Sequence, residues 1–315
     1  MRPSQIILRV SLTAMIAAVP VVATAQQQPA RGTASRQPAQ PQPQPQTQTQ
    51  THAPEPAAKP APSKIDPDGS RMKWLLNAWA KQSEKLKTLA VSIYRVDRDF
   101  RWKDEVHYEG SAYFQSPGLA YLDFSRLKLA ENDKKQLVPV PDPKKPGARI
   151  KTHTETIICS NDAVWQYLFE GKQIYVFPLA KGERQRALDE GPLPFLFNMK
   201  ADEAEARYSM TLDKENANFY LVRVIPKLQG DRETFKMALL TLDKKFLLPA
   251  QIALISPDGK STRVFYLDNQ RPNKPIDEKY FKGGVYKNWQ VVRNPTAEMP
   301  RQGSAGPRPD APARR

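Results

Sequence analysis

The side chains best suited to nucleophilic chemistry in this chain are one cysteine and three histidines. Cys159 ends the apolar run 156–159, where a free cysteine usually packs as a small hydrophobic residue. Because it is the only cysteine, no disulfide can form within the chain. A nucleophilic Cys159 would need a histidine and an orienting group beside it in space, and the spacing along the chain does not decide this.

The histidines do not form a metal-binding pattern. His52 lies in a segment rich in Gln and Pro, whereas His107 and His153 stand alone at strand positions. His153 and Glu155 would supply two metal ligands, and a zinc site needs at least one more. The sequence has no glycine-rich phosphate loop and no Gly-x-Ser-x-Gly turn. We therefore predict no catalytic residues, no metal and no cofactor, with an enzyme built on Cys159 as the less favoured alternative.

The chain begins with the pattern of a secretory signal. Arg2 and Arg9 are followed by an apolar run over 10–22 and by the small-x-small site 23–25, which a signal peptidase could cut. The run is shorter than the roughly 18 residues that a bilayer span needs. We predict a cleaved signal peptide over residues 1–25, and hence a periplasmic or otherwise exported protein; an uncleaved membrane anchor is the alternative.

Two segments have the composition of disordered chain. Residues 26–70 are dominated by Gln, Pro, Ala and Thr, and cannot bury enough apolar area to offset the entropy lost on ordering. We predict a semi-rigid, Pro-rich spacer there, and a disordered Pro- and Arg-rich tail over residues 291–315.

The formal charge of +15 restricts the partners. The charges are scattered along the chain and accompany no nucleic-acid-binding motif, so we predict no nucleic-acid partner. A solvated surface of mixed charge explains them most simply. The sharper alternative is attraction to an anionic membrane surface or a wall polymer, which salt would weaken.

Residues 71–290 predict one mainly β domain that opens with a helix. Apolar residues recur there at helical steps, at Met72, Leu75, Leu76, Trp79, Leu86 and Leu89. The period then changes to two, which predicts strands at 106–115, 120–125, 152–159, 164–168, 173–178, 207–212, 219–225, 235–242, 250–255 and 262–267. Short turns join neighbouring strands and favour an antiparallel meander. The Pro-rich stretch 131–151 predicts a loop insertion.

The apolar segment 191–199 does not fit a plain meander. Two prolines make residues 191–194 a poor strand interior, and a charged helical stretch over 200–207 follows. One interpretation is a short helix that plugs the core. The other is a lid whose apolar face closes a binding groove.

The order of these elements resembles the LolA-like superfamily of periplasmic lipoprotein carriers and their relatives. The resemblance covers nearly all of residues 71–285. It rests on the hairpin 110–118, the strands 160–167 and 173–179, the apolar segment 191–199, and the closing element 273–277 with Phe281. The tails and the Pro-rich insertion are more similar to a planctomycete branch of that superfamily. Ser116 stands where the carriers have an arginine that pins the lid, so no such lock is implied.

The resemblance implies a half-open antiparallel β-barrel of about ten or eleven strands, with an N-terminal helix and a short lid helix over its concave face. It also implies a groove that binds a lipid acyl chain or a lipoprotein in a monomeric, non-catalytic protein. The alternative is an envelope sensor or scaffold module that binds a protein partner. The candidate groove residues are Phe114, Leu122, Phe124, Trp165, Phe195, Leu196, Phe197, Leu221, Leu239 and Tyr266. A register slip of one residue would exchange the two faces of any strand.

Overall fold

The computed structural model describes residues 64–179 and 200–293, most of them in one sheet of twelve strands. Its strands are β1 (Thr88–Asp99), β2 (Asp104–Gln115), β3 (Leu119–Leu127), β6 (Lys151–Cys159), β7 (Ala163–Leu168), β8 (Gln173–Pro178), β9 (Tyr208–Glu215), β10 (Phe219–Pro226), β11 (Met237–Asp243), β12 (Pro249–Ile255), β13 (Ser261–Pro272) and β14 (Gln290–Arg293). A separate two-stranded hairpin consists of β4 (Leu129–Glu131) and β5 (Leu137–Pro139). The helices in the described chain are α1 (Ser70–Glu84), α4 (Ala201–Arg207), α5 (Gln229–Arg232) and the 3-10 helix η2 (Glu278–Phe281).

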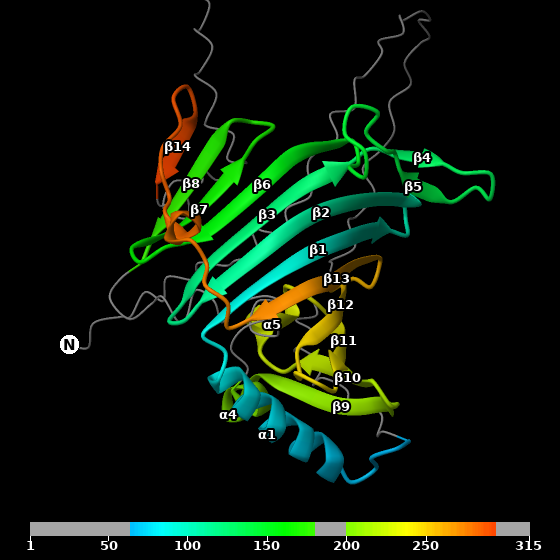
Figure 1. The fold of residues 1–315 in the computed structure, drawn as a ribbon. Helices are drawn as coiled ribbons and strands as arrows, with labels where there is room; N and C mark the ends of the chain where they lie inside the picture. The colour runs from blue at the N-terminus through cyan, green and yellow to red at the C-terminus, as the bar shows by residue number, and fades with distance from the viewer. Residues whose placement is uncertain (1–63, 180–199, 294–315) are drawn as a thin grey trace, which may run out of the picture.

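The sheet is open, with β14 at one edge and β9 at the other. Its strand order is β14-β8-β7-β6-β3-β2-β1-β13-β12-β11-β10-β9, and every neighbouring pair is antiparallel except β14 with β8. In Figure 1 the strands from β14 to β1 form a broad layer, and the sheet bends beyond β13 so that β9 comes to lie beside α1. The predicted mainly β, half-open antiparallel architecture is confirmed.

The two faces of the sheet have different surroundings. In β1, Leu89, Val91 and Ile93 point to the main hydrophobic core, and we call this side the core face. Ser92 and Tyr94 point to the other side, which we call the groove face because a pocket lies on it. Since side chains alternate along a strand, the pairing register assigns each residue of the other strands to one of these faces.

Helix α1 covers the core face through its apolar stripe. Leu75, Leu76 and Trp79 are buried there at helical spacing. At the start of α1, Arg71 forms an ion pair with Glu215 of β9, 2.9 Å between Nη2 and Oε1. Hydrogen bonds from Arg71 and Lys244 lower the pKa of Glu215 to about 2. These contacts tie the first helix of the domain to the bent end of the sheet.

Strand β1 was not predicted, and three further features differ from the prediction. The helix ends at Glu84, so Leu86 lies in the turn that follows and Leu89 lies in β1. The helical spacing of these two leucines had placed them in the helix. The predicted loop insertion 131–151 contains β5, which pairs with β4 at the start of that insertion. Strand β14 runs to Arg293, into the predicted tail, and pairs in parallel with β8, so the meander is not wholly antiparallel. Local periodicity does not report pairing between such distant segments.

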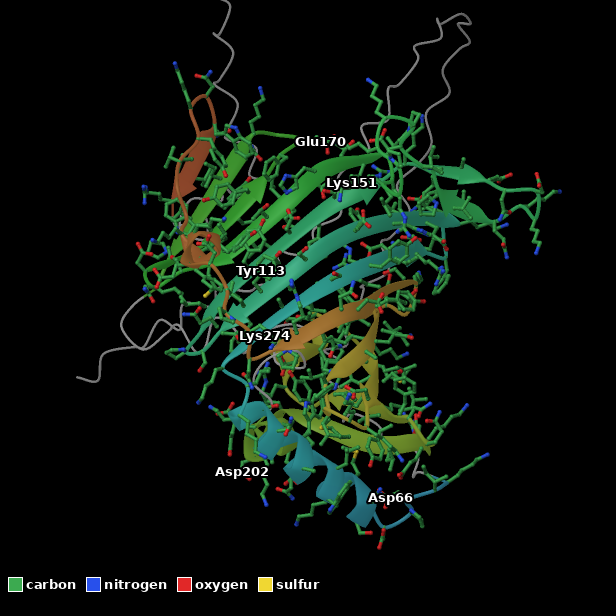
Figure 2. The ribbon with its side chains drawn as sticks, viewed as in Figure 1. Asp66, Tyr113, Lys151, Glu170, Asp202 and Lys274 are labelled. Carbon is green, nitrogen blue, oxygen red and sulfur yellow. The ribbon has the colours of Figure 1, made fainter. Side chains whose placement is uncertain are left out.

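The predicted signal peptide, most of the predicted spacer and the apolar segment 191–199 lie outside the described residues. The charged stretch that follows that segment is helical, as predicted, and forms α4 beside α1. Figure 2 shows Asp202 of α4 near α1, far from Lys151 at the start of β6. None of the described helices has the length and apolar character needed to cross a bilayer.

Candidate functional site

Three of the predicted groove residues lie together on the core face. Phe114 and Leu122 are buried in the main core, and so is Phe124. Leu122 pairs with Ala112 and with Ile157, so the apolar surface is continuous from β2 through β3 to β6. The structure therefore brings these residues together, packed among their own neighbours.

Four other predicted groove residues point to the opposite face. Tyr266 pairs with Tyr94, and Leu221 and Leu239 share its face through the pairing register from β10 to β13. Trp165 packs against a second cluster, beneath the segment that joins η2 to β14. Leu221 and Leu239 are each one residue away from a core-face neighbour, Val222 and Leu240. The remaining candidates, Phe195, Leu196 and Phe197, lie outside the described residues.

The core face ends in buried polar groups. The Arg95 guanidinium lies over the ring of Tyr108 at 3.8 Å and over that of Phe124 at 4.9 Å. Its Nε is 3.1 Å from Oδ1 of Asp97, which also pairs with Arg263 at 3.0 Å. Because Arg95 is buried, its pKa lies below the usual arginine value. A charged group thus sits where the apolar surface stops.

Glu155 belongs to the same polar end. It pairs with Phe124 across β3 and β6, and its Oε1 accepts a hydrogen bond from Nε2 of Gln166 at 2.7 Å. Burial raises the pKa of Glu155, and the hydrogen bond and nearby Arg95 offset part of that rise. The core face therefore has an apolar part and a polar part. An amphipathic ligand has parts of the same two kinds.

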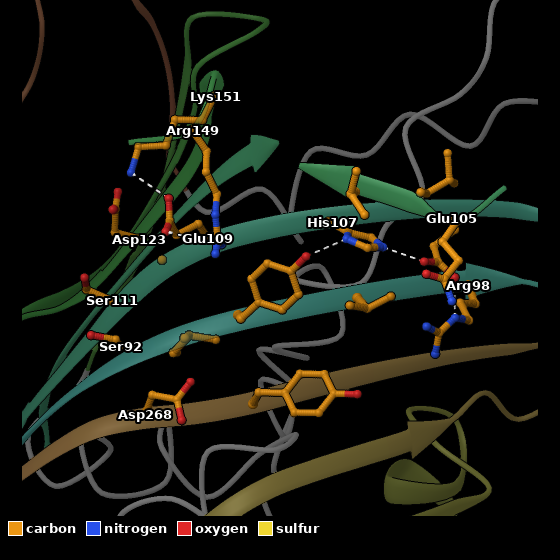
Figure 3. A pocket seen from close by; sticks show the side chains of 18 of the residues that line it. Ser92, Arg98, Glu105, His107, Glu109, Ser111, Asp123, Arg149, Lys151 and Asp268 are labelled. Carbon is orange, nitrogen blue, oxygen red and sulfur yellow. Dashed lines mark hydrogen bonds and ion pairs between the residues drawn. The ribbon is translucent and has the colours of Figure 1, made fainter. Parts of the chain in front are cut away.

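A pocket of about 1280 Å³ lies on the groove face. Tyr94 and Tyr266 lie on neighbouring strands on this face, with ring centroids 6.3 Å apart, and residues 135–138 of the hairpin β4–β5 line another side. Charged side chains dominate the remaining lining, as Figure 3 shows for Arg98, Glu105 and Arg149. Polar side chains therefore line much of the pocket, in contrast to the core face.

A chain of hydrogen bonds crosses this pocket (Figure 3). Nδ1 of His107 is 2.6 Å from the Tyr94 hydroxyl, and Nε2 is 2.5 Å from Oε1 of Glu105. Glu105 also accepts a hydrogen bond from Arg98. Burial tends to raise the pKa of Glu105, but the hydrogen bonds from Arg98 and His107 outweigh burial and hold the pKa below its usual value.

A second group of ion pairs surrounds Glu109. Its carboxylate is 3.2 Å from Nζ of Lys151 and 3.8 Å from Nη1 of Arg149. Nearby, Nε2 of His153 is 2.6 Å from Oδ1 of Asp123. These pairs are partly exposed, so a polar ligand could exchange with them at little cost.

The structure separates the residues first considered for chemistry. Cys159 is buried on the core face, whereas His107 and His153 both lie on the groove face. Within residues 64–179 and 200–293, no three His, Cys, Asp or Glu side chains are arranged to hold a metal ion. Sequence reasoning missed Tyr94 because β1 was not recognised as a strand, and it missed Glu105 because the predicted strand began at residue 106 whereas β2 begins at Asp104. Alternation over residues 91–94 is the signal that could have found Tyr94.

Comparisons with known proteins point to one family. Residues 144–283 match the family model described as outer membrane lipoprotein carrier protein LolA. A comparison with curated protein sequences finds no match. The matched range begins just after the hairpin β4–β5 and ends just after η2, so it includes the strands from β6 to β13.

Three solved structures are similar to the chain at low identity. An uncharacterized conserved protein from Thermus thermophilus has 13% identity and a TM-score of 0.40, over 71% of this chain and 99% of that chain. The Pseudomonas aeruginosa MucA/MucB complex has 14% identity and a TM-score of 0.34, over 68% and 62%. The Mycobacterium tuberculosis lipoprotein LppX has 7% identity and a TM-score of 0.32, over 66% and 98%.

The narrower resemblance to a planctomycete branch stays a prediction. The matched range includes β7, β8 and the closing element with Phe281. These are some of the segments that carry the broader resemblance. Over residues 144–283, the chain is similar to the family of the outer membrane lipoprotein carrier protein LolA.

Proposed function

We propose that this protein is an exported, non-catalytic binder of a lipid acyl chain or a lipoprotein, acting in envelope lipid or lipoprotein trafficking. The observation that carries the proposal is the match over residues 144–283 to a family model described as a lipoprotein carrier.

The side chains of the core face have suitable chemistry, and in this structure they are packed against the protein's own core. Phe114, Leu122 and Phe124 form a continuous apolar area, and Arg95 and Glu155 lie at its polar end. An acyl chain with a polar head has the same two parts. We propose that the acyl chain contacts the phenylalanine side of this face and that the polar head lies toward Arg95.

The expected affinity suits a protein that must also release its ligand. Burying about ten methylene groups contributes roughly 8 kcal/mol, at about 0.8 kcal/mol for each group. This corresponds to a dissociation constant on the order of 1 μM before ordering costs are subtracted. Such a value permits both loading and transfer.

The direct test is native mass spectrometry of the protein purified from the envelope, followed by lipid extraction. We expect the wild type to retain an acyl lipid. Phe124→Ala should bind a fluorescent fatty acid roughly tenfold more weakly or worse, because it removes a large apolar contact from the core face. Tyr266→Ala on the groove face is the matched control and should bind as the wild type does.

Thermal unfolding of each variant separates lost binding from lost folding. Phe124→Leu keeps apolar bulk and should recover much of the affinity. A wild-type protein that leaves the envelope without lipid, and that binds no fluorescent fatty acid, would refute the proposal.

Export is part of the same proposal. Cleavage after Ala25 would leave Gln26 as the first residue of the mature chain. Intact mass measurement of the protein from the envelope fraction should give this N-terminus. A chain that keeps residues 1–25 would instead favour the membrane-anchored alternative.

The second candidate function is an envelope sensor or scaffold that binds a protein partner. The polar pocket of about 1280 Å³ favours it, because partly exposed ion pairs such as Glu109 with Lys151 suit a polar peptide better than an acyl chain. Pull-down from detergent-solubilised envelope should then retain a partner with the wild type and with Phe124→Ala, and lose it with Glu109→Lys. A lipid carrier should instead lose its acyl lipid with Phe124→Ala and keep it with Glu109→Lys.

A further inference from the structure

We propose that one end of the sheet is a docking surface for an anionic lipid bilayer. This docking edge consists of the turn between β1 and β2, with Phe100 and Trp102, and the hairpin β4–β5, with Leu137 and Val138. It lies outside the core face, so the inference goes beyond the proposed function and does not depend on what that face binds.

The first observation is the exposure of large apolar side chains in the β1–β2 turn. Trp102 is 79% exposed and Phe100 is 57% exposed. Two aromatic residues that lie in one turn and are this accessible indicate an interaction surface. Tryptophan in particular is enriched at the boundary between lipid and water, where its ring lies at headgroup level.

The turn is held in place, so its aromatic residues are presented outward by an ordered backbone. The backbone N–H groups of Arg101 and Trp102 both donate to Oδ1 of Asp99, at 2.9 and 3.3 Å. The N–H of Phe100 donates to the carbonyl of Lys260 in the neighbouring β12–β13 turn at 2.9 Å. Insertion of these side chains into a membrane would therefore require little ordering of the backbone.

The second observation is the charge of residues 126–151, which comprise the hairpin and the segments on either side of it, and which we include in the docking edge. Residues 126–151 contain eight Lys and Arg against three Asp and Glu. Five of the lysines are exposed and, within the described chain, form no ion pair: Lys128, Lys134, Lys135, Lys144 and Lys145. By contrast, Arg98 in β1 is paired with Glu105, and Arg101 in the turn is paired with Asp99. Residues 129–139 of the hairpin are neutral overall, so the net positive charge of the docking edge comes from the segments beside the hairpin, with Lys128 before it and Lys144 and Lys145 after it.

The aromatic turn and the hairpin β4–β5 with its basic flanking segments lie at the same end of the sheet. Lys103 of the turn and Leu137 of the hairpin both line the pocket on the groove face. Figure 1 shows the hairpin β4–β5 projecting beyond the end of the sheet where β1 passes into β2. Leu137 and Val138 are themselves 39% and 37% exposed, which extends the apolar part of the edge.

This combination fits a bilayer that bears negative headgroups. Aromatic and aliphatic side chains enter the boundary region, while lysine amines on long stems reach the phosphate groups. Each lysine near an anionic surface strengthens binding, and salt weakens this contribution. We therefore commit to an anionic bilayer surface as the occupant of the docking edge.

The test is co-sedimentation of the protein, expressed from the full sequence, with vesicles of phosphatidylglycerol and phosphatidylethanolamine. Phosphatidylcholine vesicles and a salt series serve as comparisons. We expect binding to the anionic vesicles that weakens in high salt. Trp102→Ala should reduce affinity roughly tenfold. The double variant Lys134→Gln, Lys135→Gln should reduce it by roughly an order of magnitude and flatten the salt dependence.

Matched controls come from elsewhere on the surface. Trp74 on α1 is 50% exposed, so Trp74→Ala removes an exposed tryptophan outside the docking edge. Lys85 and Lys87 are exposed between α1 and β1, and the double change to Gln removes the same charge as the hairpin variant. Both controls should bind vesicles as the wild type does. Trp102→Tyr, which keeps an interfacial aromatic group, should restore most of the affinity.

Quenching of tryptophan fluorescence by brominated lipids gives a second readout, which reports whether the indole ring enters the bilayer. The wild type should be quenched in anionic vesicles, and Trp102→Ala should lose most of that quenching. Equal vesicle binding by the edge variants and the controls would overturn the proposal. So would equal binding to neutral and anionic vesicles, or binding that only the Trp74 variant loses.

Discussion

Gly110 illustrates how an absent side chain shapes the core face. It pairs with Phe124 across β2 and β3, and a Cβ at this position would collide with the carbonyl oxygen of Asp123 and crowd the Phe124 ring. The glycine therefore lets the aromatic ring lie against the backbone of the neighbouring strand. The hairpin pattern that begins at Gly110 has this physical basis.

Gly110→Ala should destabilise the protein by roughly 1–3 kcal/mol, because either the backbone or Phe124 must move. Urea unfolding monitored by circular dichroism measures the change. Gly230→Ala is the control, because a Cβ there meets no other atom within 4 Å. Equal stabilities of the two variants would contradict this account of the core face.

Glu155 should make stability depend on pH in a direction opposite to that of most carboxylates. Its pKa is raised by burial above the ordinary 4.5, so the folded protein holds this proton more tightly than the unfolded chain. Its contribution is fully present below about pH 4.5 and is lost as the pH rises through the raised pKa.

The comparison of wild type with Glu155→Gln isolates this effect, because the other titrating groups cancel in the difference. The stability of the wild type relative to the variant should fall as the pH increases from about 4.5. Urea unfolding of both proteins at several pH values provides the measurement. A difference that grows in favour of the wild type with rising pH would show that Glu155 is charged and well paired instead.

At the scale of elements, the segment from η2 to β14 is fastened across the groove face. The Tyr167 hydroxyl donates to the carbonyl oxygen of Gly284 at 2.9 Å and accepts from its N–H at 2.8 Å. Tyr280 of η2 lies between Tyr113 and Tyr121, with ring centroids 4.5 and 5.2 Å away. The position of the parallel strand β14 therefore depends on side-chain contacts of the residues that precede it, Tyr280 and Gly284.

Gly283 and Gly284 give a matched test of this arrangement. A Cβ at Gly283 would enter the space of the Trp165 indole, whereas one at Gly284 meets nothing within 4 Å. Gly283→Ala should release the segment and cost roughly 1–3 kcal/mol, while Gly284→Ala should be close to neutral. Limited proteolysis of residues 282–293 measures the release. Equal cleavage of both variants would mean that the segment is not held by this contact.

For the whole molecule, the strand order predicts where the structure is most resistant to opening. Strands β1, β2 and β3 lie in the middle of the sheet, and β14 is a four-residue strand at one edge. Hydrogen exchange followed by mass spectrometry should show slow exchange over residues 88–127 and fast exchange over 290–293. Uniform protection across these segments would contradict the topology.

The two proposed surfaces should also act independently. The docking edge and the core face share no residue, and residues more than about 7–10 Å apart without common partners usually act additively. Trp102→Ala should therefore weaken vesicle binding and leave acyl-lipid occupancy unchanged, and Phe124→Ala should do the reverse. Native mass spectrometry and co-sedimentation on the same two variants provide the check, and loss of both activities in both variants would argue for a single site.

Much of the fold follows from local patterns. Alternation in residues 106–115 and 219–225 located β2 and β10, and the turn at 257–260 lies between β12 and β13 as expected. These predictions succeeded because one face of each strand is more buried than the other. Strand β1 escaped prediction because Ala90 and Val96 are buried on the face opposite to Val91, so the alternation is visible only over the short stretch 91–94.

The candidate site was predicted only in part. The sequence identified Phe114, Leu122 and Phe124 as members of one apolar surface, yet placed Leu221, Leu239 and Tyr266 with them. Alternation defines two sets of residues in a strand, and the choice of which set faces the core depends on pairing register. Register is fixed by partners that are distant in sequence, such as Tyr94 with Tyr266.

By itself, the sequence determined the mainly β class, the absence of a disulfide within the chain, and the order of most strands, because these depend on composition and on the two-residue period. Only the tertiary structure decided which face is the core, how β14 joins β8, and that Lys103 of the β1–β2 turn lines the same pocket as the hairpin β4–β5. The physical reason is that these features arise from contacts between segments far apart in the chain, whose geometry exists only when the sheet has formed.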